Sequence, residues 1–393
     1  GVRPFRGGGG PLRGSKPLGD VPPWSGPGSF HRIFERRKTP IHLPRVLERL
    51  EAVACKGLNE NLVRDDQSIL GGLSKTSRTP ISEWRRDRSD TRRPGRRGSF
   101  AKVIAPNTSP LKRGALPNFG DLREIASSVR RSILTTVHHA GAGHVGGPLS
   151  ATDLLTVLYF YELQVDPLRP NWEDRDRFVF SKGHSSVALY AVLAERGYFP
   201  KEELKTFDQL DSRMQGHPDM LVTPGLDMST GSLGQGLSTA LGLALAARLR
   251  KKKYRTYAMI GDGEAQEGQI WEASMVAARY RVDNLLAILD WNGLQQYGWA
   301  GPSTDPGDRM NPIEAPAEKW RAFGWHVIEL DGHDMEAIVA SLDEARSISA
   351  RPTILIARTQ KGRGVSFMED NYLWHSRPIS DEDLGVALAE LHS

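Results

Sequence analysis

The sequence predicts an α/β fold over residues 118–393, with a doubly wound parallel sheet and helices on both of its faces. The first observation is a set of short apolar runs bounded by turn residues, such as 257–260 and 285–289, which are typical of buried strands. The second is that stretches with helical spacing of apolar residues, such as 269–281, separate these runs. Strands that alternate with helices in this way form parallel sheets covered on both sides.

The predicted elements follow in order from spacing and from turn residues. Apolar residues recur at helical intervals in the stretches 121–138, 150–161, 185–195, 237–250, 269–281 and 335–346. Apolar runs of strand length occupy the stretches 178–180, 257–260, 285–289, 325–329 and 353–357. The glycine-broken loop 141–148 separates the first two helices. The basic residues 248–253 suit the end of the fourth helix, where the helix dipole is negative.

Polar motifs follow two of the predicted strands. Gly-Asp-Gly-Glu at 261–264 comes directly after one apolar run, and Asp-Trp-Asn-Gly-Leu at 290–294 comes directly after the next. The strand–helix–strand arrangement places Asp262 and Asn292 at the carboxyl ends of neighbouring strands. Open α/β sheets bind ligands at that edge.

The chemistry of these motifs indicates a site for a divalent cation and a phosphate group. A carboxylate, an amide oxygen and a nearby backbone carbonyl suit Mg²⁺, which keeps coordination positions for phosphate oxygens and water. Gly263 has no Cβ, so its N–H can approach a phosphate, and the helix that starts near Gly268 directs its positive end there. Gly-Asp-Gly and Asn-Gly are more often ordinary turns when they occur alone. Their pairing across a whole strand–helix–strand unit favours the site.

Four histidines lie in loops marked by glycine or proline, namely His144, His184, His217 and His375. Loops at one edge of a sheet would gather them into a cluster that donates hydrogen bonds and moves protons near neutral pH. Zinc is the rival interpretation. Spacings of tens of residues, without a His-x-x-x-His pair or a local cysteine, disfavour it.

Together these motifs resemble the transketolase family. The resemblance rests on segments that occur in a characteristic order, at 142–144, 181–184, 215–218, 230–236, 261–268 and 374–376. It covers roughly residues 118–393, and the segments around Asp262 and Asn292 resemble the thiamine diphosphate motif. It therefore implies the thiamine diphosphate-binding fold, with thiamine diphosphate and Mg²⁺ (or Ca²⁺) as cofactors.

The resemblance also implies roles for individual residues. The metal ligands would be Asp262, Asn292 and the carbonyl of Leu294. Contacts to the diphosphate would come from Gly263, Asn292, His184 and His375, and contacts to the cofactor rings from Gly231, Ser232 and Leu233. The substrate would be handled by His144, His184 and His217, and activity would also depend on His375 and Glu267. Glu267 would lie at a dimer interface, or alternatively cap the helix that begins beside it.

The chain ends 18 residues after His375. In the family, the domain that follows supplies the glutamate that activates the cofactor, aromatic residues that stack on it and basic residues for the substrate phosphate. The resemblance therefore implies the N-terminal subunit of a split transketolase, which moves a two-carbon ketol unit from a ketose phosphate to an aldose phosphate. We expect a heterotetramer of two such chains with two C-terminal subunits, and no activity from this chain alone.

Two alternatives remain open. Another thiamine diphosphate enzyme of this fold, similar to 1-deoxyxylulose-5-phosphate synthase or to the α chain of a 2-oxo-acid dehydrogenase, would share Gly-Asp-Gly. The motifs at 181–184, 216–218 and 230–236 disfavour the dehydrogenase. A nucleic-acid-binding protein with a degenerate enzyme domain is the second alternative, and the intact Asp262 and Asn292 disfavour it.

Residues 1–117 differ in composition from the remainder. They hold 24 Lys and Arg against 10 Asp and Glu, whereas the other 276 residues hold 28 against 37. The segment is also rich in Gly and Pro and buries too little apolar surface to fold, so we expect a disordered basic N-terminal extension. It would be a polyanion-binding arm, an organelle transit peptide, a tail without function, or sequence upstream of the natural start. The last alternative arises because the first methionine is Met214, inside the family resemblance, so the start would be a codon read as Val or Leu before residue 118.

Cysteine content and hydropathy indicate the cellular compartment in which the protein would function. The only cysteine is Cys55, so a disulfide within the predicted domain is excluded, which suits a reducing compartment. No apolar run approaches the roughly 20 residues that span a bilayer. We therefore expect a cytoplasmic enzyme.

Overall fold

In the computed structural model, the described residues are 117–296 and 313–392, and they belong to one compact unit. The predicted basic extension lies outside the described residues, apart from Pro117. The centre of the unit is a five-stranded sheet in which every neighbouring pair of strands is parallel. In spatial order, the strands are β1 (Arg177–Phe180), β2 (Thr256–Gly261), β3 (Leu285–Trp291), β5 (Thr353–Arg358) and β4 (His326–Asp331). The predicted fold class is confirmed.

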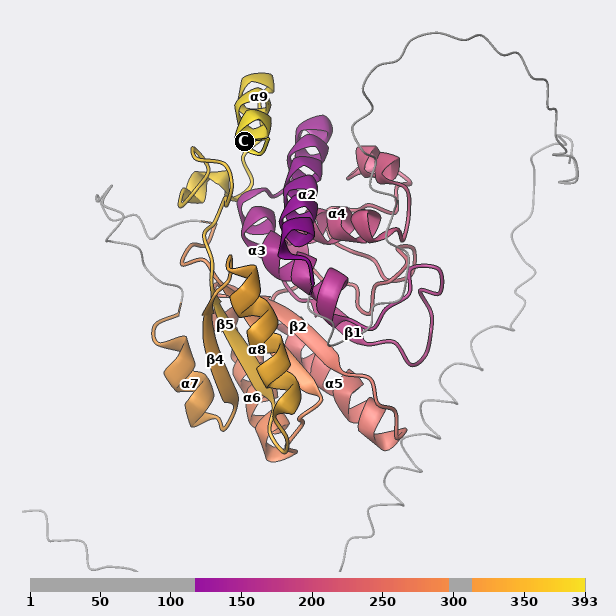
Figure 1. Ribbon diagram of the computed structural model, residues 1–393, viewed down its shortest axis with the longest axis vertical. Helices are drawn as coiled ribbons and strands as arrows, with labels where there is room; N and C mark the ends of the chain where they lie inside the picture. Colours follow the sequence, from indigo (N-terminus) through magenta and orange to yellow (C-terminus); the bar gives the residue numbers. More distant parts are fainter. Residues whose placement is uncertain (1–116, 297–312, 393) are drawn as a thin grey trace, which may run out of the picture. The chain divides into compact units, whose positions relative to one another are not determined.

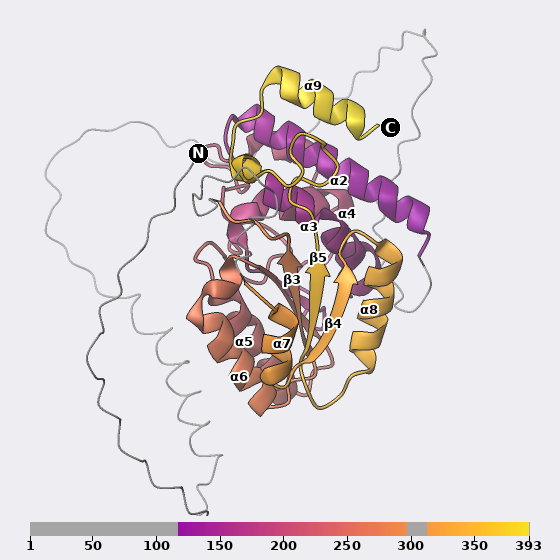
Figure 2. The same ribbon diagram turned by 90° about the vertical axis from the view of Figure 1, so that its left-hand side faces the viewer.

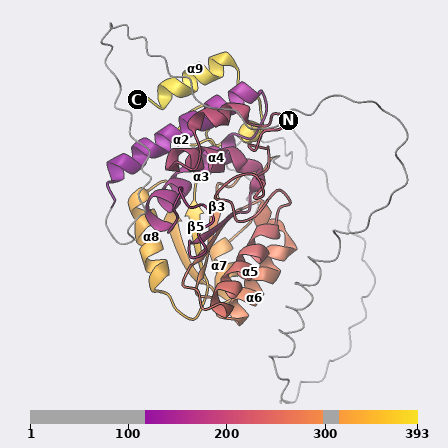
Figure 3. The same ribbon diagram turned by 90° about the vertical axis from the view of Figure 1, so that its right-hand side faces the viewer.

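Helices cover both faces of the sheet (Figure 1). One face carries α5 (Gln235–Leu249), α6 (Gly268–Arg279) and α7 (Pro316–Ala322). The other carries α3 (Gly146–Val157), its π-helical continuation η1 (Leu158–Glu162), α4 (Ser186–Arg196) and α8 (Met335–Ser347). The long helix α2 (Phe119–Ala140) lies outside α3 and α4, and α9 (Asp381–Glu390) packs on α2 (Figures 2 and 3).

The central strands β2, β3 and β5 are largely apolar because the sheet is buried on both of its faces there. In β2, Tyr257 and Met259 pack in the core formed with α2, α3, α4 and α8, whereas Ala258 and Ile260 pack in the core formed with α5, α6 and α7. Successive side chains of a strand point to opposite faces, so every position of such a strand meets a core. This is why the sequence shows short continuous apolar runs.

The helix α3 begins earlier than the sequence predicted. The prediction placed its start near Ser150, whereas the helix starts at Gly146. Pro148 then lies in the first turn, where a missing N–H has no intrahelical partner to lose. At Gly146, a Cβ would lie 2.9 Å from both the Lys361 side chain and the Trp374 carbonyl oxygen. The glycines at 146–147 therefore allow other segments of the chain to pack closely against the start of α3, and they also end the preceding loop.

Other elements are longer than predicted or were missed. The strand β3 extends to Trp291, so Asp290 lies within it and Asn292 directly follows it. The helices α7 and α9 were not predicted, although Ser380 and Asp383 form a capping box at the start of α9. Among the described residues, no helix is long and apolar enough to cross a membrane.

Candidate active site

A cavity of about 460 Å³ lies at the carboxyl edge of the sheet. The strands β1, β2, β3 and β5 all end at this edge because they are parallel, and segments that follow each of them contribute to the lining. Every residue predicted for the site except Ser232 lines the cavity: His144, His184, His217, Gly231, Leu233, Asp262, Gly263, Glu267, Asn292, Leu294 and His375. This edge is where open α/β sheets bind ligands.

The cavity brings the four predicted histidines together from four separate segments. The ring centroid of His144 lies 5.0 Å from those of His184 and His375, and the latter two rings stack at 5.3 Å. His217 lines the same cavity, and a Cβ on Gly231 would lie 3.2 Å from its ring. The 3₁₀ turns η2 (Gly183–Ser185) and η6 (Tyr372–His375) position two of the rings.

Three of these imidazoles are uncharged at neutral pH. Burial, followed by His217 and nearby lysines, lowers the pKa of His144 to about 4. Burial, followed by Lys182, lowers the pKa of His184 to about 2, and burial, followed by Lys361, lowers that of His375 to about 2. A neutral imidazole donates from one nitrogen and accepts at the other, so each ring can donate to or accept from a ligand.

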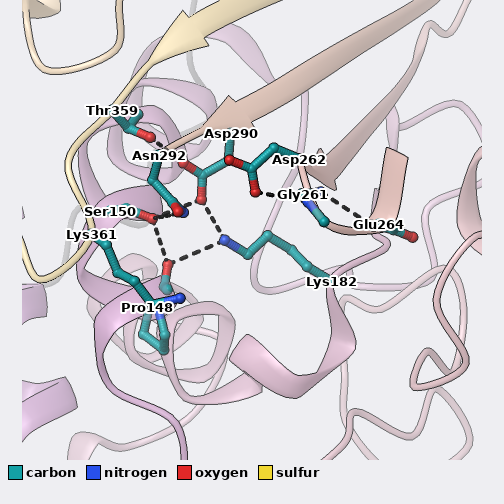
Figure 4. Close-up of polar contacts among 12 residues, drawn as sticks. Pro148, Ser150, Lys182, Gly261, Asp262, Glu264, Asp290, Asn292, Thr359 and Lys361 are labelled. Carbon is teal, nitrogen blue, oxygen red and sulfur yellow. Dashed lines mark hydrogen bonds and ion pairs between the residues drawn. The ribbon is translucent and has the colours of Figure 1, made fainter. Parts of the chain in front are cut away.

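A buried network centred on Asp290 lies at this edge of the sheet (Figure 4). Its carboxylate accepts hydrogen bonds from Lys182 Nζ, from Thr359 Oγ1 and from Ser150 Oγ, the last at 2.7 Å. Burial alone would raise the pKa of Asp290, but the Lys182 ammonium and the two hydroxyls lower it. The ionised carboxylate thereby ties the ends of β1 and β5 and the start of α3 to β3.

Asp262, the predicted metal-binding carboxylate, is buried beside this network. Its oxygens accept hydrogen bonds from the backbone N–H of Gly263 at 2.8 Å and of Gly293 at 2.6 Å. Burial and the neighbouring Asp290 raise the pKa of Asp262 to about 6. A positive charge beside Asp262 would stabilise its ionised form.

The donors around Asp262 fit a divalent cation. The Asp262 carboxylate, Asn292 Oδ1 and the carbonyl of Leu294 are hard oxygen ligands. Asn292 Oδ1 accepts the N–H of Leu294 at 3.1 Å, and the carbonyl of Leu294 lies 3.4 Å from Lys361 Nζ. Within 117–296 and 313–392, no three His, Cys, Asp or Glu side chains are grouped so that they could hold a metal ion. A cation here would therefore rely on amide, carbonyl, phosphate and water oxygens as well as Asp262.

Lys361 brings a second buried ammonium group to the cavity. Its side chain is 1% exposed, and its Nζ lies 2.9 Å from His375 Nδ1 and 3.4 Å from the carbonyls of Leu294 and Gln295. Burial, followed by Lys182, lowers the pKa of Lys361 to about 8. An anion in the cavity would relieve this repulsion. The cavity is therefore suited to a phosphate group.

Glu264, the last residue of the Gly-Asp-Gly-Glu motif, joins the walls of the cavity. It is 2% exposed, and its carboxylate accepts hydrogen bonds from Ser181 Oγ, from Gly234 N–H at 2.9 Å and from Gly261 N–H at 3.1 Å. Burial raises the pKa of Glu264. These bonds fix the ends of β1 and β2 relative to the 231–236 loop.

Two predicted residues differ from the others in their placement. Ser232 is exposed and is absent from the lining, although Gly231 and Leu233 on either side belong to it. Glu267 is exposed, lines the cavity and is the N-cap residue of α6, but its side chain makes no capping hydrogen bond. Glu267 therefore occupies the capping position without a side-chain capping bond, and its place at a dimer interface stays a prediction.

Sequence reasoning gave no role to several residues of the site. They are Ser150, Lys182, Glu264, Asp290, Thr359 and Lys361. Lys182 and Glu264 belong to motifs that were used for other residues. Thr359 and Lys361 lie shortly after the predicted strand 353–357, as Asp262 lies shortly after the predicted strand 257–260. Considering the polar residues after every predicted strand would have found both.

The fold and the site define an α/β enzyme domain that binds a phosphate-bearing cofactor at the carboxyl edge of its sheet. The sequence profile described as transketolase, thiamine diphosphate binding domain, matches residues 122–391. The chain belongs to the transketolase family.

The relatives are of two lengths. The 6-deoxy-6-sulfo-D-fructose transketolase subunit of Clostridium sp. (strain MSTE9) is 43% identical over 69% of this chain and 96% of its own length. An apulose-4-phosphate transketolase subunit of Phocaeicola vulgatus is 40% identical over 67% of this chain and 90% of its own length. The transketolase of Rattus norvegicus is 38% identical, and the match covers 69% of this chain but 42% of the rat protein.

The match to a solved structure covers a similar share of a full-length transketolase. Transketolase from Campylobacter jejuni superimposes with a TM-score of 0.64 and 33% identity, over 70% of this chain and 43% of that chain. The chain thus spans about two fifths of full-length transketolases and nearly all of the separate subunits. It therefore corresponds to the N-terminal, thiamine diphosphate-binding part of a transketolase, as the sequence predicted.

Proposed function

We propose that this chain, together with a partner subunit, transfers a two-carbon ketol unit from a ketose phosphate to an aldose phosphate. Thiamine diphosphate, when bound, supplies the carbanion chemistry for this transfer. The observation that carries the proposal is the convergence of Asp262, Lys361 and the histidine cluster on one cavity at the carboxyl edge of the sheet. The cavity combines cation ligands, a buried ammonium group and neutral proton carriers.

The diphosphate would be held on the cationic side of the cavity. Lys182 and Lys361 place two ammonium groups there, and the neutral rings of His184 and His375 offer N–H donors beside them. Lys182 is already compensated by Asp290, whereas burial lowers the pKa of Lys361 to about 8. A diphosphate would therefore stabilise the charge of Lys361 more than that of Lys182.

Mg²⁺, or Ca²⁺, would be held by Asp262, Asn292 Oδ1 and the carbonyl of Leu294, with diphosphate oxygens completing its shell. The cation would lower the pKa of Asp262, which burial and Asp290 raise to about 6. The Leu294 carbonyl, now 3.4 Å from Lys361 Nζ, would exchange the ammonium for the cation. That exchange would leave Lys361 free to contact the diphosphate.

The remaining lining would handle the sugar phosphates. His144, His184 and His217 would bond to substrate hydroxyls, and a neutral ring can serve as either donor or acceptor. His375 would bond both Lys361 and the diphosphate. Glu267, exposed at the start of α6, would contact a second copy of the chain.

A separate C-terminal subunit would complete the active site. Relatives that match over 90% or more of their length are named as transketolase subunits, which supports a split enzyme. We expect two copies of this chain and two of the C-terminal subunit in a cytoplasmic heterotetramer of carbohydrate metabolism. The nucleic-acid alternative has no support in the cavity, whose lining resembles a cofactor site.

Reconstitution tests the proposed function. The purified chain would be assayed with thiamine diphosphate, Mg²⁺, a ketose phosphate donor and an aldose phosphate acceptor, with and without the C-terminal subunit. We expect no turnover from the chain alone and turnover after the subunit is added. Full activity from the chain alone would contradict the split arrangement. A reconstituted pair inactive on a panel of sugar phosphates would contradict ketol transfer.

The substitution Lys361→Met tests the cationic side of the cavity. Losing a charge-assisted contact to phosphate costs about 1.5–3 kcal/mol, so the Kd for thiamine diphosphate should rise about tenfold to hundredfold. Isothermal titration calorimetry of the full chain with Mg²⁺ measures this change. Lys205→Met, at an exposed lysine of η3 (Lys201–Thr206), is the matched control. Equal Kd values for K361M and K205M would contradict the assignment.

A further inference from the structure

The segment 359–364 carries Lys361 into the cavity and is anchored on several sides. Thr359 donates to Asp290, the carbonyl of Lys361 accepts the N–H of Asp370 at 2.9 Å, and the N–H of Gly362 donates to the carbonyl of Gly146 at 3.0 Å. Gln360 lies between the two residues that reach the site. Its backbone N–H turns away from the cavity and donates to His333 Nε2 at 2.8 Å.

Behind His333 lies a buried ion pair that the proposed mechanism does not use. Arg130 of α2 donates to both oxygens of Asp153 of α3, at 3.0 and 2.6 Å. The same carboxylate lies 2.7 Å from His333 Nδ1, and the His333 side chain is 10% exposed. Burial alone would raise the pKa of Asp153, but Arg130 and the His333 hydrogen bond lower it to about 2. Arg130 Nε also donates to the carbonyl of Arg363 at 3.1 Å.

These partners leave His333 one tautomer. A backbone N–H can only donate, so Nε2 must accept the hydrogen bond of Gln360 and cannot carry a proton. An ionised carboxylate can only accept, so Nδ1 must carry the proton and donate to Asp153. Each hydrogen bond in this series therefore has a fixed donor. Arg130 and His333 donate to Asp153, and the backbone N–H of Gln360 donates to His333. The imidazole acts as a rigid spacer between the ion pair and the residue before Lys361.

We propose that His333 is a positioning residue for the diphosphate site, which acts through Gln360 to hold Lys361 in the cavity. The inference rests on the proposed function, because it needs Lys361 to contact the cofactor. His333 does not line the cavity and touches none of the groups assigned to cofactor or metal. Its effect on binding is therefore expected only while residue 361 is a lysine.

Two substitutions separate positioning from support of the core. In His333→Gln, the side-chain amide extends to the place of Nε2 and can accept from Gln360. In His333→Asn, the amide ends near the place of Nδ1 and can donate to Asp153, but it cannot reach Gln360. Positioning predicts that H333N weakens thiamine diphosphate binding about five- to tenfold and that H333Q changes it less than about twofold. If His333 instead served only to stabilise the buried Asp153 carboxylate, H333Q would weaken thiamine diphosphate binding more than H333N, because H333N keeps the hydrogen bond to Asp153.

The test is calorimetric titration of the full chain with thiamine diphosphate and Mg²⁺, with thermal unfolding as the check on folding. His326→Asn is the matched control, since His326 pairs with Glu344 at 2.7 Å at the start of β4, outside the cavity lining. H333N is also combined with K361M. We expect H333N to weaken binding in the wild-type background and to add less than about twofold in K361M, because two residues acting on one contact are not additive.

The outcomes separate this inference from the function on which it rests. Wild-type binding with equal losses in H333N and H333Q, or with the same H333N loss in both backgrounds, would overturn the positioning role alone. Wild-type-like binding by H333N would also overturn it. A wild-type chain that binds no thiamine diphosphate, either alone or with the C-terminal subunit present, would overturn the proposed function and this inference together.

Discussion

Lowering the pH from 7.5 to 5.5 is expected to destabilise the free chain through its buried histidines, and His184 offers the clearest measurement. Burial, followed by Lys182, lowers the pKa of its imidazole to about 2. In the unfolded chain, the pKa of a histidine is about 6.5. Between these values only the unfolded state binds the proton, so stability is lost as the pH falls below about 6.5.

The expected magnitude follows from the same two pKa values. One unit below the unfolded pKa, protonation stabilises the unfolded state by about 1.4 kcal/mol relative to neutral pH. Since the imidazole keeps some exposure, we expect a contribution of about 1 kcal/mol at pH 5.5. Asp262 acts in the opposite direction, because its pKa is raised to about 6 and its protonation in the folded state stabilises the fold as the pH falls. A comparison of wild type with His184→Asn removes the contribution of Asp262, which is common to both.

The assay is urea unfolding of wild type and H184N at pH 7.5 and 5.5. Wild type should lose about 1 kcal/mol more than H184N between the two conditions, whatever the stability of each at pH 7.5. His139→Asn, at an exposed histidine near the end of α2, controls for removing an imidazole elsewhere. Equal losses for wild type and H184N would refute the reasoning, since they would mean that His184 takes up its proton equally in both states.

Two further substitutions test the packing around the cavity. Asp290→Asn would leave the Lys182 ammonium buried without its carboxylate, which should lower the free energy of unfolding by about 3–5 kcal/mol, and a loss below about 1 kcal/mol in urea unfolding would contradict the network. Gly236→Ala would place a Cβ 2.2 Å from Ser181 Oγ, whereas Gly242→Ala, also on α5, meets nothing within 4 Å. We expect G236A to lower the free energy of unfolding by about 1–3 kcal/mol and G242A to leave it unchanged or raise it by up to about 1 kcal/mol. Equal effects in the two variants would contradict the close approach at residue 236.

The sequence predicted the centre of the sheet well because β2, β3 and β5 are buried on both faces. A short, continuous apolar run such as 285–289 is typical of a strand buried on both faces. The polar residues that follow this run place Asn292 at the end of the strand. The same logic located Asp262. Element order and the carboxyl-edge site therefore follow from local pattern alone.

What the sequence could not supply were contacts between distant segments. Lys361 and His375 are 14 residues apart and look unrelated along the chain, yet their side chains lie 2.9 Å apart. The start of α3 was misplaced because Gly146 and Gly147 resemble a loop until Lys361 and Trp374 are seen against them. Asp290 looks like one more polar residue after a strand, and only the packing of β1, β3 and β5 shows that three donors converge on it.

That convergence on Asp290 means that the receptor for the cofactor is preorganised. Its carboxylate is 0% exposed and accepts hydrogen bonds from Ser150, Lys182 and Thr359, all of them groups of the chain itself. A ligand that enters such a cavity does not have to order these segments, so little conformational entropy is lost on binding.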